Sequence, residues 1–591
     1  MLRTATRTAG GAFSRIVAFP DHQDLRAYVA WRLMQFVAES IRGRFVPLTG
    51  LLCVIVLCVS GFALLVPGIG QLPVFGQEEA SLAQSSRQMH DSGHLLLPEV
   101  SHLTPFVGPP LVHWLHVLSA KITQLPDIIT TYRLVSLLGA FVCAYFTYRL
   151  GADLFSRQTG FLAALGLLAA PLVAVDARQA GAGQFLMAAT VCAVFLGWRL
   201  WPQNTEVRIR RVAVIPFALA IAFGTLAEGP VLPILTLLAG GMLAVRARSI
   251  LPIRNIHPIT IVAIASLPVM VWILMVIRRV GWASVLELFE QGIFWHWSRI
   301  DNGQLILPGF HLLYLPVLLW PLSFLMGQAI VSCWNDRCEA RIWLLAWIVP
   351  GWFFFEFAAP NSAKITMPLY PLVAVLLAST IETWMPVKHW SRGLLVAGWG
   401  LLGLGVPTIA WLARGDAIST SLFNIHSAGS NLWFCLTLAV AILAVGFAVR
   451  ALLVGKGVLG LVSAVVASAF GSHALFAQSL PSHQGLWVTE AVVAALEAAS
   501  GRSAASPDGP SLATVGYTNA SLLFATNGRV VMAPDSPLEW VQDQGDRWLL
   551  DDGSLGELST DLIVVRTLSG YRYTRGSPVE LRLIRPCGDR P

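Results

Sequence analysis

The sequence predicts a polytopic α-helical membrane protein that ends in a small extracytoplasmic α/β domain. Hydrophobic residues make up 55% of the 591-residue chain and charged residues only 12%, against about 25% charged residues in soluble domains. Apolar runs near the length that spans a bilayer, about 20 residues, recur along most of the chain. The last stretch changes character, because short β-branched runs such as LIVVRTL alternate there with Gly, Asp, Ser and Pro.

Residues 1–46 are predicted to lie in the cytoplasm and at the inner membrane surface. The segment 25–45 places apolar residues at helical spacing with arginines between them, which is typical of an amphipathic interfacial helix. Seven arginines precede the first long apolar run, and that run begins too late for a cleaved signal peptide. Positive charge before the first span places the N-terminus in the cytoplasm.

Residues 47–477 are predicted to form a transmembrane domain of about thirteen helices. The expected spans are 49–66, 134–150, 159–175, 184–200, 212–227, 230–246, 257–277, 305–326, 342–358, 366–383, 393–412, 431–450 and 457–477. Short loops rich in Lys and Arg alternate with poorer ones, although Arg278 and Arg279 break this pattern. An odd count places residues 478–591 outside the cytoplasm. Cytoplasmic Lys and Arg also account for the net charge of +7, so no nucleic-acid partner is expected.

The long extracytoplasmic loop 67–133 is the first candidate for chemistry, because Glu78 and Glu79 lie near its start. Adjacent carboxylates beside a membrane are more often simply solvated. Here, however, they follow directly where a helix leaves the membrane, a place where a lipid-carried substrate is met. A carboxylate in that position is suited to act as a general base toward an acceptor hydroxyl.

Several strings in the chain resemble one family of membrane enzymes. EEASLAQSSRQMHDSGHLLLPEV followed by PFVGPPLVHWL is similar to the first extracytoplasmic loop of the ArnT and protein-mannosyltransferase-like glycosyltransferases, which have the GT-C fold. Arg133 and Ser136 fit the R-x-x-S pattern of the family's second span. PVLLWPLS and MPLYP match later landmarks, and GYTNASLLF and GYRYTRG resemble the C-terminal domain of bacterial members.

The resemblance implies an inverting glycosyltransferase of a bacterial inner membrane, active in lipid glycosylation of the cell envelope. Such enzymes move a sugar from a polyprenyl-phosphate donor to a lipid, glycan or protein acceptor at the periplasmic face, where the C-terminal domain also lies. It implies that Glu78, supported by Glu79, is the base or positions a metal, so a divalent metal is possible although no cofactor is certain. Lys364 and Arg178 are the expected partners of the donor phosphate.

This chain departs from the family pattern at several charged positions. The family's loop Asp is Glu78 here, its second acidic position falls on Gly183, and its Lys-Gly-Pro is Glu228-Gly229-Pro230. Val107 and Gly108 replace the Lys before the Pro turn, and Lys364 is displaced by three residues. An alternative therefore stays open: a catalytically degenerate relative that binds lipid-linked glycan or scaffolds a partner enzyme.

The segment FWHWSRIDNG supplies a further group of predicted substrate contacts, namely Trp297, Arg299 and Asp301. Aromatic rings beside charged groups on this side of the membrane stack on a sugar or form an interfacial aromatic belt. The two interpretations are equally supported by the sequence.

Histidines in the long loop raise the question of a metal site. His90 and His94 are four residues apart and His113 and His116 are three apart, a spacing that suits ligands on one helix face. No Cys accompanies them, and histidines are common at membrane interfaces. Structural or solvated roles are therefore favoured, and no metal ligand is assigned.

Overall fold

The computed structural model describes residues 50–97, 109–201, 207–283, 286, 309–358, 363–421, 425–517, 519–542, 546–556, 558, 561–572 and 577–587. The chain forms two compact units, residues 1–56 and 57–591. Of the first unit only residues 50–56, which begin a helix, are described, so the predicted interfacial helix lies outside the described residues. The predicted division of the chain at residues 46 and 477 stays a prediction.

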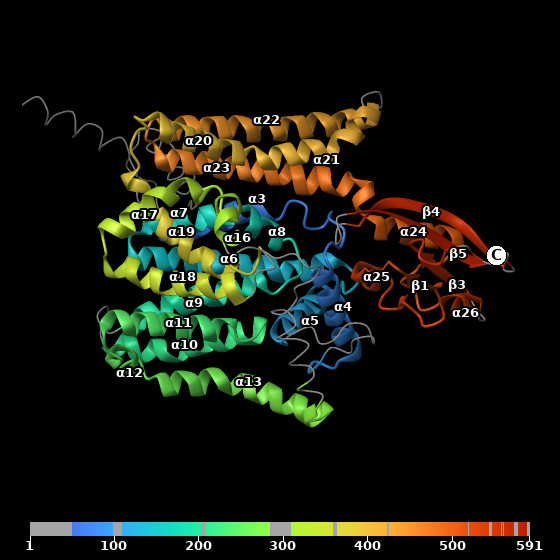
Figure 1. Ribbon diagram of the computed structural model, residues 1–591, viewed down its shortest axis with the longest axis horizontal. Coiled ribbons are helices and arrows are strands. Elements are labelled where there is room, and N and C mark those ends of the chain that lie inside the picture. Colours follow the sequence, from blue (N-terminus) through green and yellow to red (C-terminus); the bar gives the residue numbers. More distant parts are fainter. Residues whose placement is uncertain are drawn as a thin grey trace, which may run out of the picture. The chain divides into compact units, whose positions relative to one another are not determined.

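The second unit is mainly helical, and most of its helices run side by side (Figure 1). Its helices up to residue 280 are α3 (Gly50–Leu65, which begins in the first unit), α4 (Gln77–Ser92), α5 (Leu111–Thr123), α6 (Ile129–Leu154), α7 (Arg157–Leu168), α8 (Pro171–Asp176), α9 (Gly183–Leu200), α10 (Val207–Glu228), α11 (Val231–Ala247), α12 (Leu251–Arg254) and α13 (Pro258–Val280). The later ones are α16 (Phe310–Leu318), η3 (Leu322–Leu325), α17 (Met326–Asn335), α18 (Glu339–Ala358), η4 (Met367–Leu369), α19 (Tyr370–Ala378), η5 (Ile381–Thr383), α20 (Trp390–Gly403), α21 (Gly405–Ser421), α22 (Ile425–Leu453), α23 (Gly457–Ser472) and the π-helix η6 (His473–Ser479).

The predicted polytopic helical fold is confirmed, but the count of thirteen spans is not. Within the described residues, seven helices are long and apolar enough to cross a membrane, or eight if the pair bent by 117° between α16 and α17 is one span. Four shorter apolar helices, of 10–17 residues, accompany them. Several expected spans are interrupted; residues 159–175, for example, form α7 and then α8, which begins at Pro171. Proline at a first helical position starts a new helix readily because its missing N–H is not needed there.

Small residues allow neighbouring helices of the bundle to approach closely. A Cβ added at Gly160 of α7 would lie 2.1 Å from the carbonyl oxygen of Tyr148 in α6, and one at Gly151 would lie 2.5 Å from the Cα of Gly160. Only glycine fits at this contact, as is common where membrane helices pack without a hydrophobic driving force.

The long loop between α3 and α6 is itself folded into the two helices α4 and α5. Gly76, with φ of 95°, precedes α4, and Gly93, in the left-handed conformation, ends it. The sequence of α4 is polar, yet nine of its sixteen residues are buried. Burial of so many polar groups requires partners, and these partners define the candidate site described below.

The predicted C-terminal α/β domain is confirmed. Its strands β1 (Ser511–Val515), β2 (Val531–Met532), β3 (Arg547–Asp551), β4 (Leu562–Arg572) and β5 (Ser577–Pro586) form one sheet in the order β2-β1-β3-β5-β4. Strand β1 pairs in parallel with β2 and β3, whereas β5 pairs antiparallel with β3 and β4. The helices of the domain are α24 (Val488–Ser500), α25 (Ala520–Ala525) and α26 (Pro537–Gln542), after the short turns η7 (Leu480–Ser482) and η8 (Gln484–Leu486).

The C-terminal domain packs directly on α4. The guanidinium of Arg87 in α4 donates to the carbonyl oxygen of Phe524 in α25 at 2.6 Å and lies 4.4 Å from the centroid of its ring. Ala80 of α4 belongs to the same hydrophobic cluster as the buried core of the domain, including Trp548 and Leu583. The helix that carries Glu78 and Glu79 is therefore held from the C-terminal domain as well as from the bundle.

Candidate active site

Glu79 is the residue that fastens α4 to the bundle. Its side chain is buried, and both carboxylate oxygens accept hydrogen bonds from Arg133 of α6, at 2.8 and 3.0 Å. The backbone N–H groups of Phe75 and Ala180 also donate hydrogen bonds to this carboxylate, each at 3.0 Å. Every oxygen of Glu79 is thus occupied by protein, which assigns this carboxylate a structural role rather than direct support of chemistry at Glu78.

Arg133 in turn organises the chain that leads into α4. Its remaining donors bond the carbonyl oxygens of Ile69, Leu72 and Pro73 at 2.6 to 2.8 Å. The guanidinium fork makes such a multiple contact possible, which the ammonium of a lysine cannot copy. The arginine of the R-x-x-S pattern is therefore an anchor for the site.

The serine of the same pattern holds the turn between α8 and α9. The Ser136 hydroxyl accepts from the N–H of Gly181 at 3.1 Å and donates to the carbonyl oxygen of that residue at 3.2 Å. Together with the bond from Ala180 to Glu79, this contact fixes residues 177–183 against α4 and α6. The turn presents Asp176 and Gln179 on its other side.

Lys364 meets this turn from a distant part of the sequence. Its Nζ lies 3.1 Å from Oδ1 of Asp176 and also donates to Oε1 of Gln179. The other oxygen of Asp176 accepts from Gln184 of α9 at 3.0 Å. One third of the Lys364 side chain is exposed while Asp176 is almost fully buried, so the ammonium forms the open side of the pair.

Two further carboxylates act on the same ammonium. Glu78 is exposed at the start of α4 and interacts electrostatically with both Lys364 and Glu228, the last residue of α10. Oε2 of Glu228 is buried and makes no hydrogen bond within the described part of the chain. Burial lowers the pKa of Lys364, but the charges of Asp176 and Glu78 outweigh that effect and raise it above its ordinary value. The lysine is therefore cationic at neutral pH, and the carboxylates of Asp176 and Glu78 outnumber it two to one.

The acidic position that the sequence assigns to Gly183 is filled from another residue. A Cβ added at Gly183 would lie 3.0 Å from Oδ2 of Asp176 and 2.9 Å from the Sδ-methyl of Met367. The carboxylate of Asp176 thus lies where a side chain at 183 would begin. The charge expected at this place is present, although it comes from seven residues earlier in the chain.

Arg178 does not join the cluster, contrary to its predicted role as a phosphate partner. It is fully buried, and its guanidinium donates to the carbonyl oxygens of Pro67, Ala174 and Leu64 at 2.6 to 2.8 Å. It also lies 4.4 Å from the ring centroid of Phe476, and burial lowers its pKa to about 9. Arg178 stays outside the cluster because its side chain points under the turn, toward the end of α3. The side chains of Asp176 and Gln179 point to Lys364 instead.

The other predicted substrate contacts lie outside the described residues. These are Trp297, Arg299 and Asp301, and the same holds for Val107 and Gly108. Of the predicted site residues, the structure therefore brings together Glu78 and Lys364, adds Asp176, Gln179 and Glu228, and assigns Glu79 and Arg178 to the supporting framework.

Two of the loop histidines are buried beneath α4 and share one partner. The Ser86 hydroxyl lies 2.9 Å from Nδ1 of His113 and 3.0 Å from Nδ1 of His116. Burial, with a smaller contribution from His113, lowers the pKa of His116 to about 3, so this ring is neutral at physiological pH. His90 instead pairs with Asp91 at 2.9 Å near the surface. Among the described side chains no three His, Cys, Asp or Glu residues are grouped to hold a metal ion.

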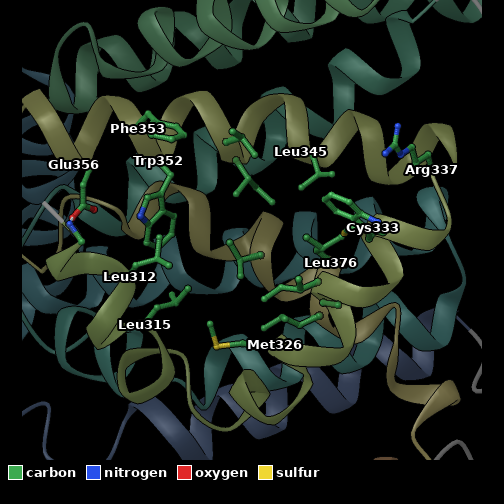
Figure 2. A pocket seen from close by; sticks show the side chains of 18 of the residues that line it. Leu312, Leu315, Met326, Cys333, Arg337, Leu345, Trp352, Phe353, Glu356 and Leu376 are labelled. Atoms are coloured by element: carbon green, nitrogen blue, oxygen red, sulfur yellow. The ribbon is translucent and has the colours of Figure 1, made fainter.

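A long apolar groove lies within the bundle between α16, α17, α18 and α19 (Figure 2). Its volume is about 760 Å³, and its walls include Leu312, Met326, Trp352 and Leu376. Figure 2 shows Glu356 at one end and Arg337 at the other. At the first end Glu356 bonds His311 at 3.1 Å and the backbone N–H of Gly309. This end belongs to the same side of the bundle as Lys364, because α18 ends there and the turn with Lys364 follows it.

The bundle with folded loop helices and a docked α/β domain defines a class of membrane protein, the GT-C type, which comparison with solved structures supports. ArnT from Cupriavidus metallidurans bound to undecaprenyl phosphate matches with a TM-score of 0.68 at 16% identity, over 90% of this chain and 97% of that one. The same protein in the apo state matches with a TM-score of 0.66 at 17% identity. The predicted GT-C architecture is therefore confirmed.

Curated relatives point to the same group of proteins. Two undecaprenyl phosphate-α-4-amino-4-deoxy-L-arabinose arabinosyl transferases match, that of Aeromonas salmonicida at 23% identity over 59% of this chain and that of Pectobacterium carotovorum at 26% over 58%. The matched part spans 64% and 62% of the length of these relatives. No family model matches the chain. The predicted resemblance to ArnT-like proteins is confirmed.

Proposed function

We propose that this protein is a glycosyltransferase that moves a sugar from a polyprenyl-phosphate donor to a lipid or glycan acceptor. The observation that carries the proposal is the meeting of Glu78, Asp176, Glu228 and Lys364, which come from four separate segments, at one end of a GT-C bundle. The relatives' names support a donor of this kind. They do not favour the alternative of a non-catalytic glycan-binding scaffold.

In this proposal Lys364 receives the donor phosphate. Negative charge grows on the phosphate as the sugar leaves, and a preorganised cation stabilises that charge in the transition state. Asp176 and Gln179 hold the ammonium in place, so no reorientation is needed during the reaction. Burial of Asp176 makes this support firm, while the exposed part of Lys364 is available to the substrate.

Glu78 is the proposed general base toward the acceptor. It is the exposed carboxylate of the cluster, whereas its neighbour Glu79 is fully bonded. A carboxylate that is ionised beside a lysine can take the proton from an attacking hydroxyl as the new glycosidic bond forms. As the acceptor oxygen bonds the anomeric carbon, the bond from that carbon to the phosphate oxygen breaks. Glu78 keeps the proton, and the phosphate leaves on the polyprenyl carrier.

We further propose that the transferred sugar carries an amino group. The carboxylates of Asp176 and Glu78 outnumber the single positive charge of Lys364, and one oxygen of Glu228 makes no hydrogen bond among the described residues. A protonated amine would supply both the charge and the donor. The relatives' names include an aminosugar, in agreement with this choice.

The apolar groove of Figure 2 is the proposed place for the polyprenyl chain. It runs inside the bundle, and one end lies on the side of Lys364, so a chain held there would lead its phosphate toward the ammonium. The protein is then an integral protein of a bacterial inner membrane. We place its N-terminus in the cytoplasm and the cluster and C-terminal domain at the periplasmic face.

Transfer measured with purified protein tests the function. We expect Glu78→Gln and Lys364→Gln each to lower the rate from an undecaprenyl-phosphate aminosugar by about 100-fold or more. Asp91→Asn, on the exposed end of the same helix α4, is the matched control and should keep the rate. Full activity of Glu78→Gln would contradict its role as base. Binding of the donor without any turnover by the unmutated protein would favour the scaffold alternative.

A further inference from the structure

One face of α4 packs on the C-terminal domain. Ala80, Ala83 and Arg87 recur at the spacing of a helical face, and all three are buried. Figure 1 shows α25 beside this helix. The short side chains of the two alanines allow the domain to approach α4 closely. A different contact, the bond from Arg133 to Glu79, holds the same helix to the bundle.

Phe524 of α25 reaches from the C-terminal domain into the junction of three segments. It is buried in one cluster with Ala83 of α4, Tyr132 of α6 and Ala180 of the turn between α8 and α9. Its ring meets that of Tyr132 edge-on, with the ring centroids 6.1 Å apart. The hydroxyl of Tyr132 donates to the carbonyl oxygen of Pro126 at 2.7 Å, which fixes this ring in place. One side chain of the domain is therefore packed among α4, α6 and the turn.

Two of these segments carry parts of the proposed sugar-transfer site. The turn presents the two partners of Lys364, and the start of α4 carries Glu78. The backbone N–H of Ala180 donates to the carboxylate of Glu79 at 3.0 Å, so the turn and α4 are also bonded to each other. A shift of this junction would therefore move the partners of Lys364 and the start of α4 together.

Arg87 fixes Phe524 against α4 through both its backbone and its ring. The guanidinium donates to the carbonyl oxygen of Phe524 at 2.6 Å and lies 4.4 Å from the centroid of the ring. It also donates to Gln84, three residues earlier on α4. A Cβ added at Gly528 would lie 2.8 Å from Nε2 of Gln84, so the chain that follows α25 runs directly against α4 as well.

The helix α25 is itself fixed within the domain. Leu522 and Leu523 belong to the hydrophobic core that contains Trp548. The side chain of Asn519 caps the helix by accepting a hydrogen bond from the backbone N–H two residues later, at 3.1 Å. Phe524 belongs instead to the cluster shared with α4 and α6. The position of the domain is therefore passed to the junction through this ring.

We propose that Phe524 is a positioning residue for sugar transfer, through which the C-terminal domain holds Glu78 and the partners of Lys364 in their working geometry. This inference rests on the proposed function. Phe524 is 7% exposed and enclosed by protein, so it acts through α4 and the turn and not on the substrate. A shift of about 1 Å in a catalytic group can cost about 100-fold in rate, so a small movement of these segments is enough to matter.

Transfer kinetics and amide hydrogen exchange of the full-length protein test this role together. We expect Phe524→Ala to lower kcat about tenfold or more and to leave the KM for an undecaprenyl-phosphate aminosugar within about twofold, since the groove of Figure 2 is unchanged. Exchange at the N–H groups of Ala180 and Gly181, which bond Glu79 and Ser136, should become faster.

Three further variants separate positioning from general loss of stability. Leu549→Ala removes a fully buried side chain from a second cluster of the domain, which includes no described residue of α4, α6 or the turn, and should keep kcat and the exchange rate. Phe524→Leu fills most of the space of the ring and should keep kcat within about threefold. Arg87→Met loosens the same contact from the side of α4 and should lower kcat as Phe524→Ala does.

The proposal is overturned if Phe524→Ala keeps both kcat and the exchange rate, if only one of the two changes, or if Leu549→Ala changes both equally. Where Phe524→Ala does not fold, the same outcomes are read from Arg87→Met. If the unmutated protein transfers no sugar, the proposed function fails, and exchange at Ala180 then decides whether Phe524 holds the turn.

Discussion

Two groups of charges lie on either side of the first turn of α4, and they are built in opposite ways. Beneath the helix, Glu79, Arg133 and Arg178 are buried, and their hydrogen bonds go to protein groups at short distances. Above it, Glu78 and Glu228 lie near Lys364, so that carboxyl groups outnumber the cation, and one oxygen of Glu228 makes no hydrogen bond among the described residues. The lower group is an anchor. The upper group has a carboxylate oxygen without a hydrogen bond and an exposed carboxylate, and a substrate site needs such groups.

The largest effect is expected from breaking the anchor. Arg133→Met leaves the carboxylate of Glu79 buried without its partner, and removal of one partner from a buried ion pair costs about 3–5 kcal/mol. Thermal unfolding in detergent measures this loss. Arg199→Met, which breaks the half-exposed pair with Asp153, is the control and should cost about 1 kcal/mol or less. Equal effects of the two variants would mean that Arg133 is not the anchor.

A smaller effect, which depends on pH, is expected from the histidines below α4. The pKa of His116 is about 3 in the folded protein, against about 6.5 in an unfolded chain. Its stabilising contribution is therefore complete above pH 6.5 and is lost as the pH falls toward 3. At pH 5 the loss reaches about 2 kcal/mol, since one pKa unit corresponds to 1.36 kcal/mol.

The measurement is the change in unfolding free energy between pH 7 and pH 5. His116→Gln should flatten this change, whereas His90→Gln, which alters a partly exposed histidine, should leave it as it is. A slope that is the same in all three proteins would show that His116 is not the titrating group.

The smallest effect is expected at Gly183, where the carboxylate of Asp176 occupies the place of the family's second acidic residue. Gly183→Asp adds a second carboxylate next to Asp176, whose Oδ2 lies 3.0 Å from the position of the new Cβ. Repulsion between the two carboxylates should lower transfer about tenfold. Adding Asp176→Gly to this variant should restore much of the rate, because only one carboxylate then remains at this place. Gly183→Asn, which has the same shape without the charge, separates steric from electrostatic effects. A double variant as slow as the single one would indicate that the two positions are not interchangeable.

Much of the architecture could be predicted from the sequence because it depends on local properties. The apolar runs gave the helical membrane fold, the β-branched runs gave the C-terminal sheet, and Arg133 and Ser136 could be recognised as a pattern. The number of spans could not be predicted, since the breaks at Ala170 and between α16 and α17 depend on how each segment packs.

The site could be predicted only in part. Glu78 and Lys364 were identified, but Asp176 was given no role, and Glu228 was counted only as the replacement of a family lysine. No local signal shows that residues 185 positions apart, Gln179 and Lys364, lie in contact. Arg178 lies two residues after Asp176, but its side chain points in a different direction. The prediction therefore placed it on the wrong side of the turn.

The sequence by itself determined the fold class of this protein and the loop that carries its acidic residues. Only the tertiary structure decided that Glu79 is buried as an anchor while Glu78 is exposed. Consecutive residues of an α-helix point about 100° apart, so these two identical side chains meet different surroundings. What each of them does depends on the helices and turns that distant parts of the chain bring against it.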